Sequence, residues 1–551
     1  MLQSAIVLEN VVFVRNNLLS SGTLCLHKLV ADDCIQVLEK MSAFGLIPSL
    51  LVGSLSCLLY YVLSFYYRVS RLPKGPTPLP FIGNILSFRS SKPIHEVFND
   101  LSARFPPMYT IYVGPKPIVV IADSKLGVEA MRKVVFAGRP DYGITKLLFP
   151  EDSIDVFFGD YSREWEVLKK VAHEAIKKYT SSARHPFLVS RVVDQLFDRT
   201  DADGNRQDLT VYDDFALMMN AILASAAFGK EYEFDDAEFL SWRRSIDRSG
   251  LGSGKLVLIF LIPMCKYIFG DTWARFEEEK DFQNEFIDKR FNESRESFDG
   301  TEVVSTFCQA IISAKNEAED EDKDISKFMT FNNLRNVVND LFFAGTDTTR
   351  NTLTWVFLFL CKNEDMQNRI RNEIRQVVGS VENIPLPEHK DECHYTMAFI
   401  AEVLRFRTII PNGVPHKTTA DTELADYRIP KGTIVLHPFF KALNEPDSWT
   451  DPDIFNPDRF LLDGRFSKQS HTFFIPFGVG RRSCPGNQLA LLTMFLVIAR
   501  MMQKSDQLNG TFCVKGGNES VGTDGEKIAA GWKSEKYTMV VVNSCGDTMN
   551  T

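Results

Sequence analysis

One cysteine of the chain stands where a thiolate could be stabilised. Cys484 follows a turn-forming stretch that contains Gly478 and Gly480, and it precedes an apolar helical pattern over residues 489–501. Glycines let a backbone turn tightly and approach a flat ligand. The unpaired N–H groups at a helix N-terminus favour an anionic sulfur. The spacing therefore predicts that Cys484 is predisposed to be a thiolate.

The residues around Cys484 form a wider pattern. Arg482 can pair with an acidic group of a ligand, and Phe477 can shield one face of the site. A lone cysteine at a helix start is more often a buried structural thiol. Here Phe477, Gly480, Arg482, Cys484 and Gly486 match in full the haem signature F-x-x-G-x-R-x-C-x-G, so the chain resembles the cytochrome P450 family. The resemblance implies a haem b cofactor, with Cys484 as the axial iron ligand and Phe477, Arg482 and Gly486 as haem contacts.

A second element lies within the helical pattern of residues 333–362. Gly345 is poor in a helix interior, and threonine hydroxyls can bond back to carbonyls one turn earlier, so this site can open a local groove. In the family, the matching A-G-x-D-T-T segment passes over the distal face of the haem. The resemblance then implies that Thr348 holds dioxygen and its water, and that Asp347 relays protons for cleavage of the O–O bond.

Glu402 and Arg405 carry opposite charges one helical turn apart, a spacing that is common on ordinary solvated helices. They lie between the Thr348 segment and the segment that contains Arg459, and they resemble the family's E-x-x-R element. That resemblance implies a buried ion network of Glu402, Arg405 and Arg459 whose role is structural. Asp458 stands where many relatives carry Glu, which leaves Arg459 in register.

Three further residues resemble haem contacts. Trp165 and Lys169 fit the family's W-x-x-x-R/K pattern, in which both residues contact haem propionates, and lysine can meet that need as a point charge. His416 stands where relatives place a third propionate partner, although a single histidine is otherwise an ordinary turn or surface residue. The implied cofactor site thus includes Trp165, Lys169 and His416.

An uncharged stretch from Met41 to Tyr67 is long enough for one transmembrane helix. Arg68, Arg71 and Lys74 follow it, and the positive-inside tendency places the rest of the chain in the cytoplasm. A cleaved signal peptide is the alternative, but the apolar stretch is too long and lacks a clear cleavage site. Together with the resemblance, the anchor predicts an endoplasmic reticulum membrane protein with a cytoplasmic catalytic domain.

The chain is expected to divide into four parts: an extension of unknown role (1–40), the anchor (41–67), a basic and proline-rich linker (68–84) and a haem domain (85–551). Closely spaced prolines cannot continue a helix, which is why the linker is expected to be extended. Strand-like runs at 108–113 and 118–121 precede helical apolar spacing at 164–178, 210–229, 333–362 and 395–407. The predicted fold is mainly α with a small β-sheet region, the cytochrome P450 fold, preceded by one transmembrane helix. The acidic stretch 317–322 predicts a solvated loop.

Composition narrows the classes of partner. A net charge of −9 gives no support to a nucleic-acid partner, which usually binds a basic face. An apolar content of 44%, with 43 phenylalanines, is sufficient to enclose a large apolar ligand. The 10 cysteines show no C-x-x-C pair and no regular spacing, which predicts a reduced protein body.

The resemblance implies a monooxygenase that inserts one oxygen atom into a lipophilic substrate such as a steroid, fatty acid or xenobiotic. The chain shows no flavin or nicotinamide motif, so electrons are expected from NADPH–cytochrome P450 reductase, with cytochrome b5 as a further candidate donor. A basic surface for the reductase is expected at Lys169, Lys170, Lys177 and Lys178. Substrate contacts are expected from 142–158, 210–265, 342–346 and 409–414.

Two alternatives stay open. A thiolate-haem isomerase or dehydratase acts on peroxides and needs neither dioxygen nor a reductase, but such enzymes commonly lose the acid–alcohol pair that is present here as Asp347 and Thr348. A haem-binding sensor or carrier would keep the fold without turnover. Consumption of NADPH in the presence of a reductase, and its dependence on added lipophilic compounds, would separate these classes.

Overall fold

The computed structural model describes residues 50–89, 92–141, 153–199, 208–249, 255–256, 259, 263–298, 304–321, 324–468, 471–515 and 538–542. The chain consists of two compact units, Met1–Arg71 and Leu72–Thr551. The expected extension 1–40, residues 41–49 of the expected anchor and residues 142–152 of the expected substrate contacts lie outside the described residues.

The described part of the first unit contains one long helix, Leu50–Val69. It covers residues 50–67 of the predicted transmembrane segment. Within the described ranges, two helices are long and apolar enough to cross a membrane, this one and α8 (Val211–Phe228). Large side chains such as Leu51 and Leu55 are exposed on the first helix, which is costly in water and favourable in a bilayer. Helix α8 is mostly buried inside the second unit. The first helix therefore fits a single membrane span, and α8 is a core helix.

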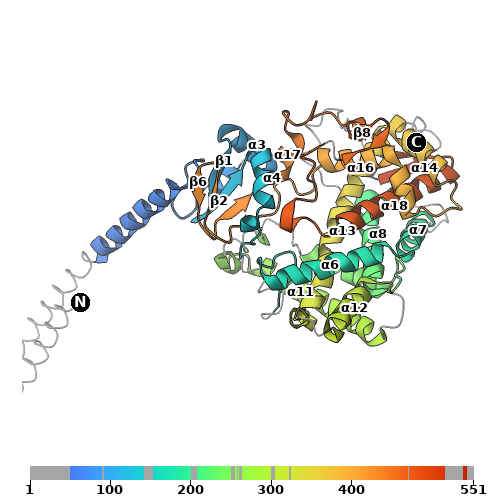
Figure 1. Ribbon diagram of the computed structural model, residues 1–551, viewed down its shortest axis with the longest axis horizontal. Coiled ribbons are helices and arrows are strands. Elements are labelled where there is room, and N and C mark those ends of the chain that lie inside the picture. Colours follow the sequence, from blue (N-terminus) through green and yellow to red (C-terminus); the bar gives the residue numbers. More distant parts are fainter. Residues whose placement is uncertain are drawn as a thin grey trace, which may run out of the picture. The chain divides into compact units, whose positions relative to one another are not determined.

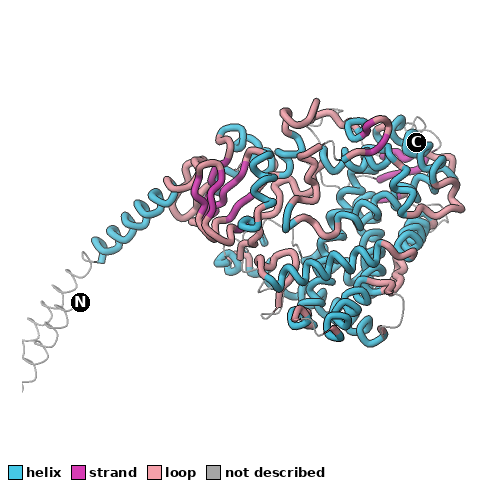
Figure 2. The backbone as a smooth tube through the Cα atoms, in the orientation of Figure 1, coloured by secondary structure: helices cyan, strands magenta, loops and turns pink. Residues whose placement is uncertain are grey.

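Helices make up most of the second unit (Figures 1 and 2). Beside α8, the long helices are α6 (Arg163–Thr180), α11 (Gly270–Ser297), α13 (Phe331–Lys362) and α18 (Asn487–Gln507). The shorter helices are α3 (Ile94–Arg104), α4 (Ser124–Arg132), α7 (Arg184–Phe197), α9 (Ala237–Ser249), α12 (Phe307–Asp320), α14 (Glu364–Val377), α15 (Pro387–Glu392), α16 (His394–Phe406) and α17 (Phe439–Asn444). Short 3₁₀ turns are η1 (Ile85–Phe88), η2 (Val134–Phe136), η3 (Pro263–Tyr267), η4 (Ser326–Phe328), η5 (Pro457–Phe460) and η7 (Gly480–Arg482).

Helix α13 runs through the main hydrophobic core and packs along α8 (Figure 1). Leu353, Val356 and Leu360 are fully buried and recur at helical spacing, so this face of α13 belongs to the core. Gly345 lies against α8, and an added Cβ would lie 3.0 Å from Leu223 Cδ1, which is tighter than an ordinary contact. The packing thus explains a glycine in a helix interior.

The main sheet has four strands in the order β1-β2-β7-β4. β1 (Met108–Val113) is antiparallel to β2 (Lys116–Ile121), β2 is parallel to β7 (Ile434–Leu436), and β7 is antiparallel to β4 (His416–Lys417). The smaller sheets are β10 (Thr511–Lys515), β11 (Thr538–Val542) and β3 (Leu209–Thr210); β5 (Thr422–Leu424) and β6 (Tyr427–Ile429); and β8 (Leu461–Leu462) and β9 (Arg465–Phe466). The pairing of β4 with β7 fixes the position of His416, which lies opposite Val435.

The C-terminal end of the linker packs on the main sheet. Gly83 has a φ of +66°, and an added Cβ would lie 2.2 Å from Tyr112 O, so only glycine fits there. The next residue, Asn84, accepts a hydrogen bond from Tyr112 N through Oδ1 at 2.8 Å. Two residues therefore hold the end of this segment against β1.

The structure confirms the predicted fold class and the predicted helices and strands, with ends that shift by a few residues. The predicted loop at 317–322 is wrong for residues 317–320, which form the last turn of α12. Buried Ala318 and the ion pair of Lys315 with Glu319 support that turn. Cys513 is disulfide-bonded, so the expectation of a fully reduced body is also wrong.

Candidate active site

A cavity of about 360 Å³ lies between α13 and the loop that carries Cys484. Its wall on the α13 side includes Ala344, Gly345 and Thr348. Parts of the expected substrate-contact regions also line it: Val156 and Phe157, Met219 and Leu223, Ala344 and Gly345, and Ile409, Ile410 and Val414. The cavity therefore brings together the cysteine, the threonine and the apolar surface that the sequence analysis treated separately.

The cysteine loop turns as the glycines predict. Gly478 and Gly480 have φ values of +70° and +74°, which L-residues with side chains rarely adopt. An added Cβ at Gly480 would lie 2.1 Å from Met131 O, because the loop passes directly over the end of α4. The amide of Cys484 donates to Phe477 O at 2.9 Å and closes the turn. Gly486, by contrast, meets no close atom, since its added Cβ would lie 3.8 Å from Cys484 Sγ.

The protein alone does not favour the thiolate form of Cys484. Burial raises the pKa of the thiol, and this effect outweighs the backbone N–H of Gly486 and the charge of Lys169, which both lower the pKa. The thiol is accessible from the cavity but is otherwise enclosed by protein. The N–H at the helix start lowers the pKa, as the sequence predicts, but this effect is smaller than the effect of burial. A cationic metal on the sulfur would reverse the balance, because a coordinating thiol loses its proton.

Threonine hydroxyls of α13 bond back to carbonyls one turn earlier, as the sequence predicts. Thr346 Oγ1 donates to Phe342 O at 2.8 Å and Thr348 Oγ1 donates to Ala344 O at 2.7 Å. The helix nevertheless continues without interruption from Phe331 to Lys362. Thr348 thus presents its hydroxyl at the cavity wall from an intact helix.

The structure separates Asp347 from Thr348. Asp347 is not among the residues that line the cavity, and its side chain is 56% exposed. Its Oδ1 lies 3.2 Å from Nη2 of Arg350, which is itself largely buried. The Arg350 guanidinium lies 4.3 Å from the centre of the Tyr212 ring. This ion pair holds the carboxylate on the outer face of α13.

Four basic side chains from different segments line one side of the cavity: Arg139, Lys169, His416 and Arg482. Burial, followed by the charge of Arg139, lowers the pKa of Arg482 to about 9. Burial, followed by the charge of Arg482, lowers the pKa of Lys169 to about 8. Burial lowers the pKa of His416 to about 3. His416 is therefore neutral near pH 7, whereas Arg139, Lys169 and Arg482 are cations that lie close to one another, an arrangement that an anionic ligand would relieve.

Backbone carbonyls fix these side chains. Arg482 donates to Ala137 O at 2.7 Å and to Gly159 O at 2.8 Å, and Lys169 Nζ donates to Ser483 O at 2.9 Å. The ring nitrogen Nδ1 of His416 lies 2.6 Å from Phe136 O, to which it donates. The contacts orient three of the predicted cofactor-binding residues toward one site.

Trp165 lies at the same wall of the cavity, and the face of its ring contacts Arg482. Its indole N–H donates to Val156 O at 2.9 Å, and the Arg482 guanidinium lies 3.7 Å from the ring centre. The indole N–H, the one hydrogen-bond donor of this side chain, is therefore occupied by a protein carbonyl. Phe477 and Gly486 also line the cavity, as the signature predicts.

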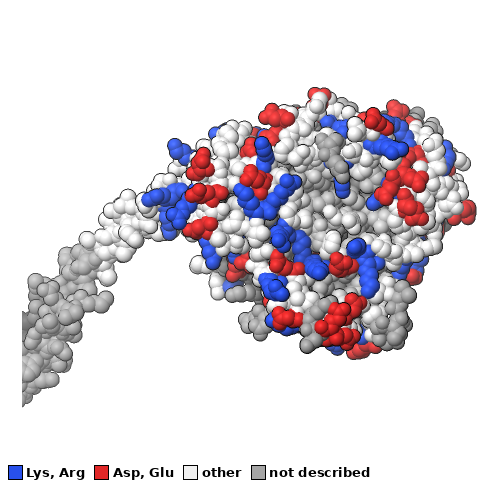
Figure 3. Space-filling model, in the orientation of Figure 1, with Lys and Arg blue, Asp and Glu red and all other residues white. Residues whose placement is uncertain are grey.

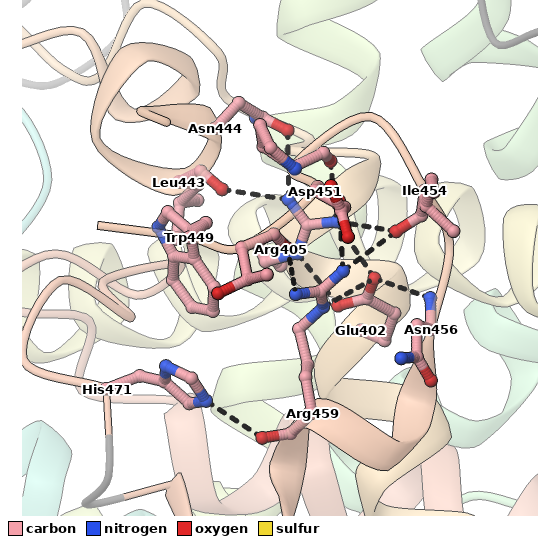
Figure 4. Close-up of polar contacts among 12 residues, drawn as sticks. Glu402, Arg405, Leu443, Asn444, Trp449, Asp451, Ile454, Asn456, Arg459 and His471 are labelled. Carbon is pink, nitrogen blue, oxygen red and sulfur yellow. Dashed lines mark hydrogen bonds and ion pairs between the residues drawn. The ribbon is translucent and has the colours of Figure 1, made fainter. Parts of the chain in front are cut away.

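The structure brings Glu402, Arg405 and Arg459 together in the interior (Figure 4). Glu402 and Arg405 are fully buried, and the Arg405 Nε lies 2.7 Å from Glu402 Oε2. Arg459 Nε lies 3.1 Å from Glu402 Oε1. Asp458 lies outside this network and pairs with Arg369 at 2.9 Å on the surface. The change from Glu to Asp at that position therefore leaves the network intact.

Sequence reasoning missed three residues of this region. Arg139 belongs to the cationic side of the cavity, Arg350 pairs with Asp347, and Asp340 contributes a carboxyl to the cavity wall. Of these three, only Asp340 gave a signal in the sequence, because it is an aspartate within an otherwise apolar part of the helical pattern 333–362. The roles of Arg139 and Arg350 depend on contacts that only the folded chain creates.

The comparisons with known proteins identify the family. A family model described as Cytochrome P450 matches residues 73–506. The chain belongs to the cytochrome P450 family. It is 29% identical over 496 residues to "Cytochrome P450 1A1" of Platichthys flesus, an alignment that covers 85% of this chain and 92% of that protein. It is 28% identical to "Cytochrome P450 2U1" of Rattus norvegicus, with 86% and 91% covered, and 29% identical to "Cytochrome P450 2A13" of Homo sapiens, with 84% and 93% covered.

The site fits the haem b of a cytochrome P450. A haem carries two propionates, and Arg139, Lys169 and Arg482 on one side of the cavity supply the positive charge that two carboxylates need. The thiol of Cys484 opens into the same cavity, and it is the kind of sulfur ligand that the haem of this family uses. This chain is a haem-thiolate monooxygenase, and the isomerase and carrier alternatives are not favoured.

Proposed function

We propose that Cys484 is the axial ligand of the haem iron and that Lys169, His416 and Arg482 hold the propionates. The observation that carries this proposal is that Cys484, the one thiol among the described residues that line the cavity, opens into the same cavity as the cations. Trp165 supports Arg482 through its ring, and Phe477 and Gly486 complete the wall beside the sulfur. Glu402, Arg405 and Arg459 act behind this site as structural residues.

The ferrous carbon monoxide difference spectrum tests this assignment. The parent protein is expected to show a strongly red-shifted Soret band, and Cys484→Ser is expected to lose that band. Cys361→Ser is the control, because Cys361 is a partly buried thiol of α13 that does not line the cavity. An ordinary Soret position in folded parent protein, or an unchanged band in Cys484→Ser, would show that another group is the ligand.

The haem, when bound, supplies the activation of dioxygen for insertion of one oxygen atom into a C–H bond or double bond. The chain's own residues then hold the substrate, exclude water and deliver protons. The Thr348 Oγ1–H is already donated to Ala344 O, so the hydroxyl oxygen is oriented to accept a hydrogen bond from a water in the cavity. Asp347 collects protons from solvent, and it must leave Arg350 to pass them inward.

This division of roles predicts uncoupled turnover in two variants. Thr348→Ala and Asp347→Asn are expected to consume NADPH while releasing more of the reduced oxygen as peroxide, with product formation lowered about 100-fold in the stronger case. Thr354→Ala is the control, since its hydroxyl makes the same kind of bond, to Arg350 O at 3.0 Å, away from the cavity. If all three variants form the same amount of product per NADPH consumed, neither Thr348 nor Asp347 has the proposed role in proton delivery.

Electrons are proposed to come from NADPH–cytochrome P450 reductase, with cytochrome b5 as a second donor. Lys and Arg side chains gather on the face over α4 and the first half of α6 (Figure 3). The exposed cations on or directly beside α4, α6 and η7 are Lys125, Arg132, Lys133, Arg163, Lys170, Lys177, Lys178 and Arg481. Lys169 differs from the expectation, because its amine turns inward to the cysteine loop. An acidic reductase would bind this basic face.

Charge reversal tests the docking face. Lys170→Glu with Lys177→Glu is expected to slow reduction of the haem by the reductase, with the loss growing at low salt, because the charges steer the encounter. Reduction by dithionite and the haem content should stay unchanged. An unchanged rate with the reductase would remove this face from the proposal.

The helix Leu50–Val69 is proposed to anchor the chain in the endoplasmic reticulum membrane, with the haem domain on the cytoplasmic side. The basic residues Arg68, Arg71 and Lys74 after the helix support this orientation. A lipophilic substrate fits the mainly apolar cavity wall. Protease added to sealed microsomes should digest the haem domain; protection from the protease would reverse the orientation.

A further inference from the structure

Two neighbouring aromatic rings connect the cavity to the surface of the protein. Among the described residues that line the cavity, Trp165 is the one tryptophan, and none is a tyrosine. The side chain of Trp165 is buried, and its ring centre lies 5.7 Å from that of Tyr161, which is partly exposed to solvent. Tryptophan and tyrosine are the aromatic side chains that lose an electron most readily. The two rings therefore form a short path along which an electron can move between the surface and the cavity.

The hydroxyl of Tyr161 has a proton acceptor beside it. It donates to Glu166 Oε1 at 2.5 Å, and this bond raises the pKa of the Tyr161 phenol. A neutral phenol loses an electron readily when its proton leaves at the same time, because the oxidised phenol is a strong acid. The carboxylate of Glu166 can take that proton. The bond is not needed to begin α6, because Ser162 caps this helix by accepting from Trp165 N at 3.1 Å.

The charges around the two rings favour Tyr161 as the site that stays oxidised. The Arg482 guanidinium lies 3.7 Å from the centre of the Trp165 ring, and Lys169 Nζ lies 5.4 Å from it. Both cations would repel a positive charge on the Trp165 ring. At Tyr161, transfer of the proton to Glu166 leaves a neutral ring, which the cations do not repel. Trp165 therefore passes the charge on, and Tyr161 retains the oxidation.

We propose that Trp165 and Tyr161 carry oxidising equivalents from the haem site to the surface, where small electron donors such as ascorbate reduce Tyr161. This route gives the protein a peroxidase activity beyond its monooxygenase reaction. It goes beyond the proposed function and requires only that the haem lies in the cavity. The peroxide released in uncoupled turnover supplies the oxidant, so the route protects the haem and its cysteine loop when no substrate is oxidised.

The electrons and protons of this route balance. Reaction of the haem site with hydrogen peroxide breaks the O–O bond and leaves the site two electrons short. Tyr161 returns one electron through Trp165 and passes its proton to Glu166. Ascorbate then gives one electron to the Tyr161 radical, and Glu166 returns the proton. A second round restores the site, and hydrogen peroxide ends as two molecules of water after taking two protons from ascorbate or solvent.

Rapid-freeze electron paramagnetic resonance tests the route in the full-length holoprotein without substrate. After mixing with hydrogen peroxide, the parent is expected to show a tyrosyl radical, identified by the change in its hyperfine pattern when the tyrosines are ring-deuterated. Tyr161→Phe keeps the ring but has no phenolic proton to lose, so it should lose this radical. With peroxide present, Tyr161→Phe should also oxidise ascorbate more slowly and bleach its haem faster than the parent.

Three further variants separate the route from packing and from direct attack by peroxide. Glu166→Gln keeps a hydrogen-bond acceptor that cannot take the proton, so it should lose most of the radical. Arg481→Gln removes the ion pair that Arg481 makes with Glu166 at 3.0 Å but leaves the carboxylate, so it should keep the radical. Tyr267→Phe removes a tyrosine that is 79% exposed, and it should keep the radical as well.

Three results would overturn the proposal: no tyrosyl radical in a parent protein that contains haem, a radical that persists in Tyr161→Phe, or a radical that is lost in Tyr267→Phe. The ferrous carbon monoxide spectrum of each protein is recorded first. An ordinary Soret position there would refute Cys484 as the ligand, whereas the radical experiment decides the route through Trp165 and Tyr161 separately.

Discussion

Removing the central carboxylate of the buried ion network should destabilise the fold more than any surface charge does. Glu402 accepts from Arg405 Nε at 2.7 Å, from Arg405 Nη2 at 2.8 Å, from Arg459 Nε at 3.1 Å and from Asn456 N at 2.9 Å. Glu402→Gln keeps the shape but leaves two buried arginines without a counter-charge. Breaking a buried pair in this way costs about 3–5 kcal/mol.

The control lies next to the network in sequence. Asp458 makes two bonds to Arg369, at 2.9 and 3.2 Å, but both side chains are about half exposed. Asp458→Asn should therefore cost about 1 kcal/mol or less. Urea unfolding, followed by tryptophan fluorescence and by the Soret band, measures both variants. Midpoints of Glu402→Gln and Asp458→Asn that differ by less than the equivalent of about 1 kcal/mol would refute the reasoning.

Two further predictions concern the cysteine loop and acid stability. Gly480→Ala should lose most of its haem, because its Cβ would meet Met131 O at 2.1 Å, whereas Gly486→Ala should keep it; equal haem contents would contradict this account. His185 is buried between Tyr179 and Thr493, and burial lowers its pKa from 6.5 to about 3. The unfolded chain therefore binds a proton below pH 6.5 that the folded chain does not bind until about pH 3, so stability is complete above pH 6.5 and falls as pH drops, by about 1.4 kcal/mol per unit. The free energy of unfolding, measured with urea between pH 6 and pH 4, should fall less steeply with decreasing pH in His185→Gln than in the parent. Equal slopes in the two proteins would exclude this histidine as the cause.

The cysteine loop and the Thr348 helix could be predicted from sequence because their chemistry is encoded locally. Gly480 must be glycine for a turn that a few neighbouring residues define, and the threonine back-bonds of α13 span a single helical turn. The predicted strands 108–113 and 118–121 likewise pair with each other across a short connection.

The parts that sequence could not supply depend on distant contacts. The raised pKa of the Cys484 thiol follows from enclosure by the whole fold, which a helix-start argument does not contain. Asp347 turns outward because Arg350 is held against Tyr212 on another helix. Asp340 became visible as a cavity residue only when the segment 153–157 was placed on α13.

The basic side of the cavity is assembled across the length of the chain, and this has a consequence for biosynthesis. Arg482 reaches Ala137 O across 345 residues, and Lys169 reaches Ser483 O across 314 residues. Such contacts form late, because closing long loops is slow and requires both partners to be present. During synthesis, the earlier elements must therefore stay soluble with an incomplete cavity until the cysteine loop has left the ribosome. Haem capture is accordingly one of the last steps of folding, and a chain truncated before Cys484 retains neither the sulfur nor the closed cationic wall.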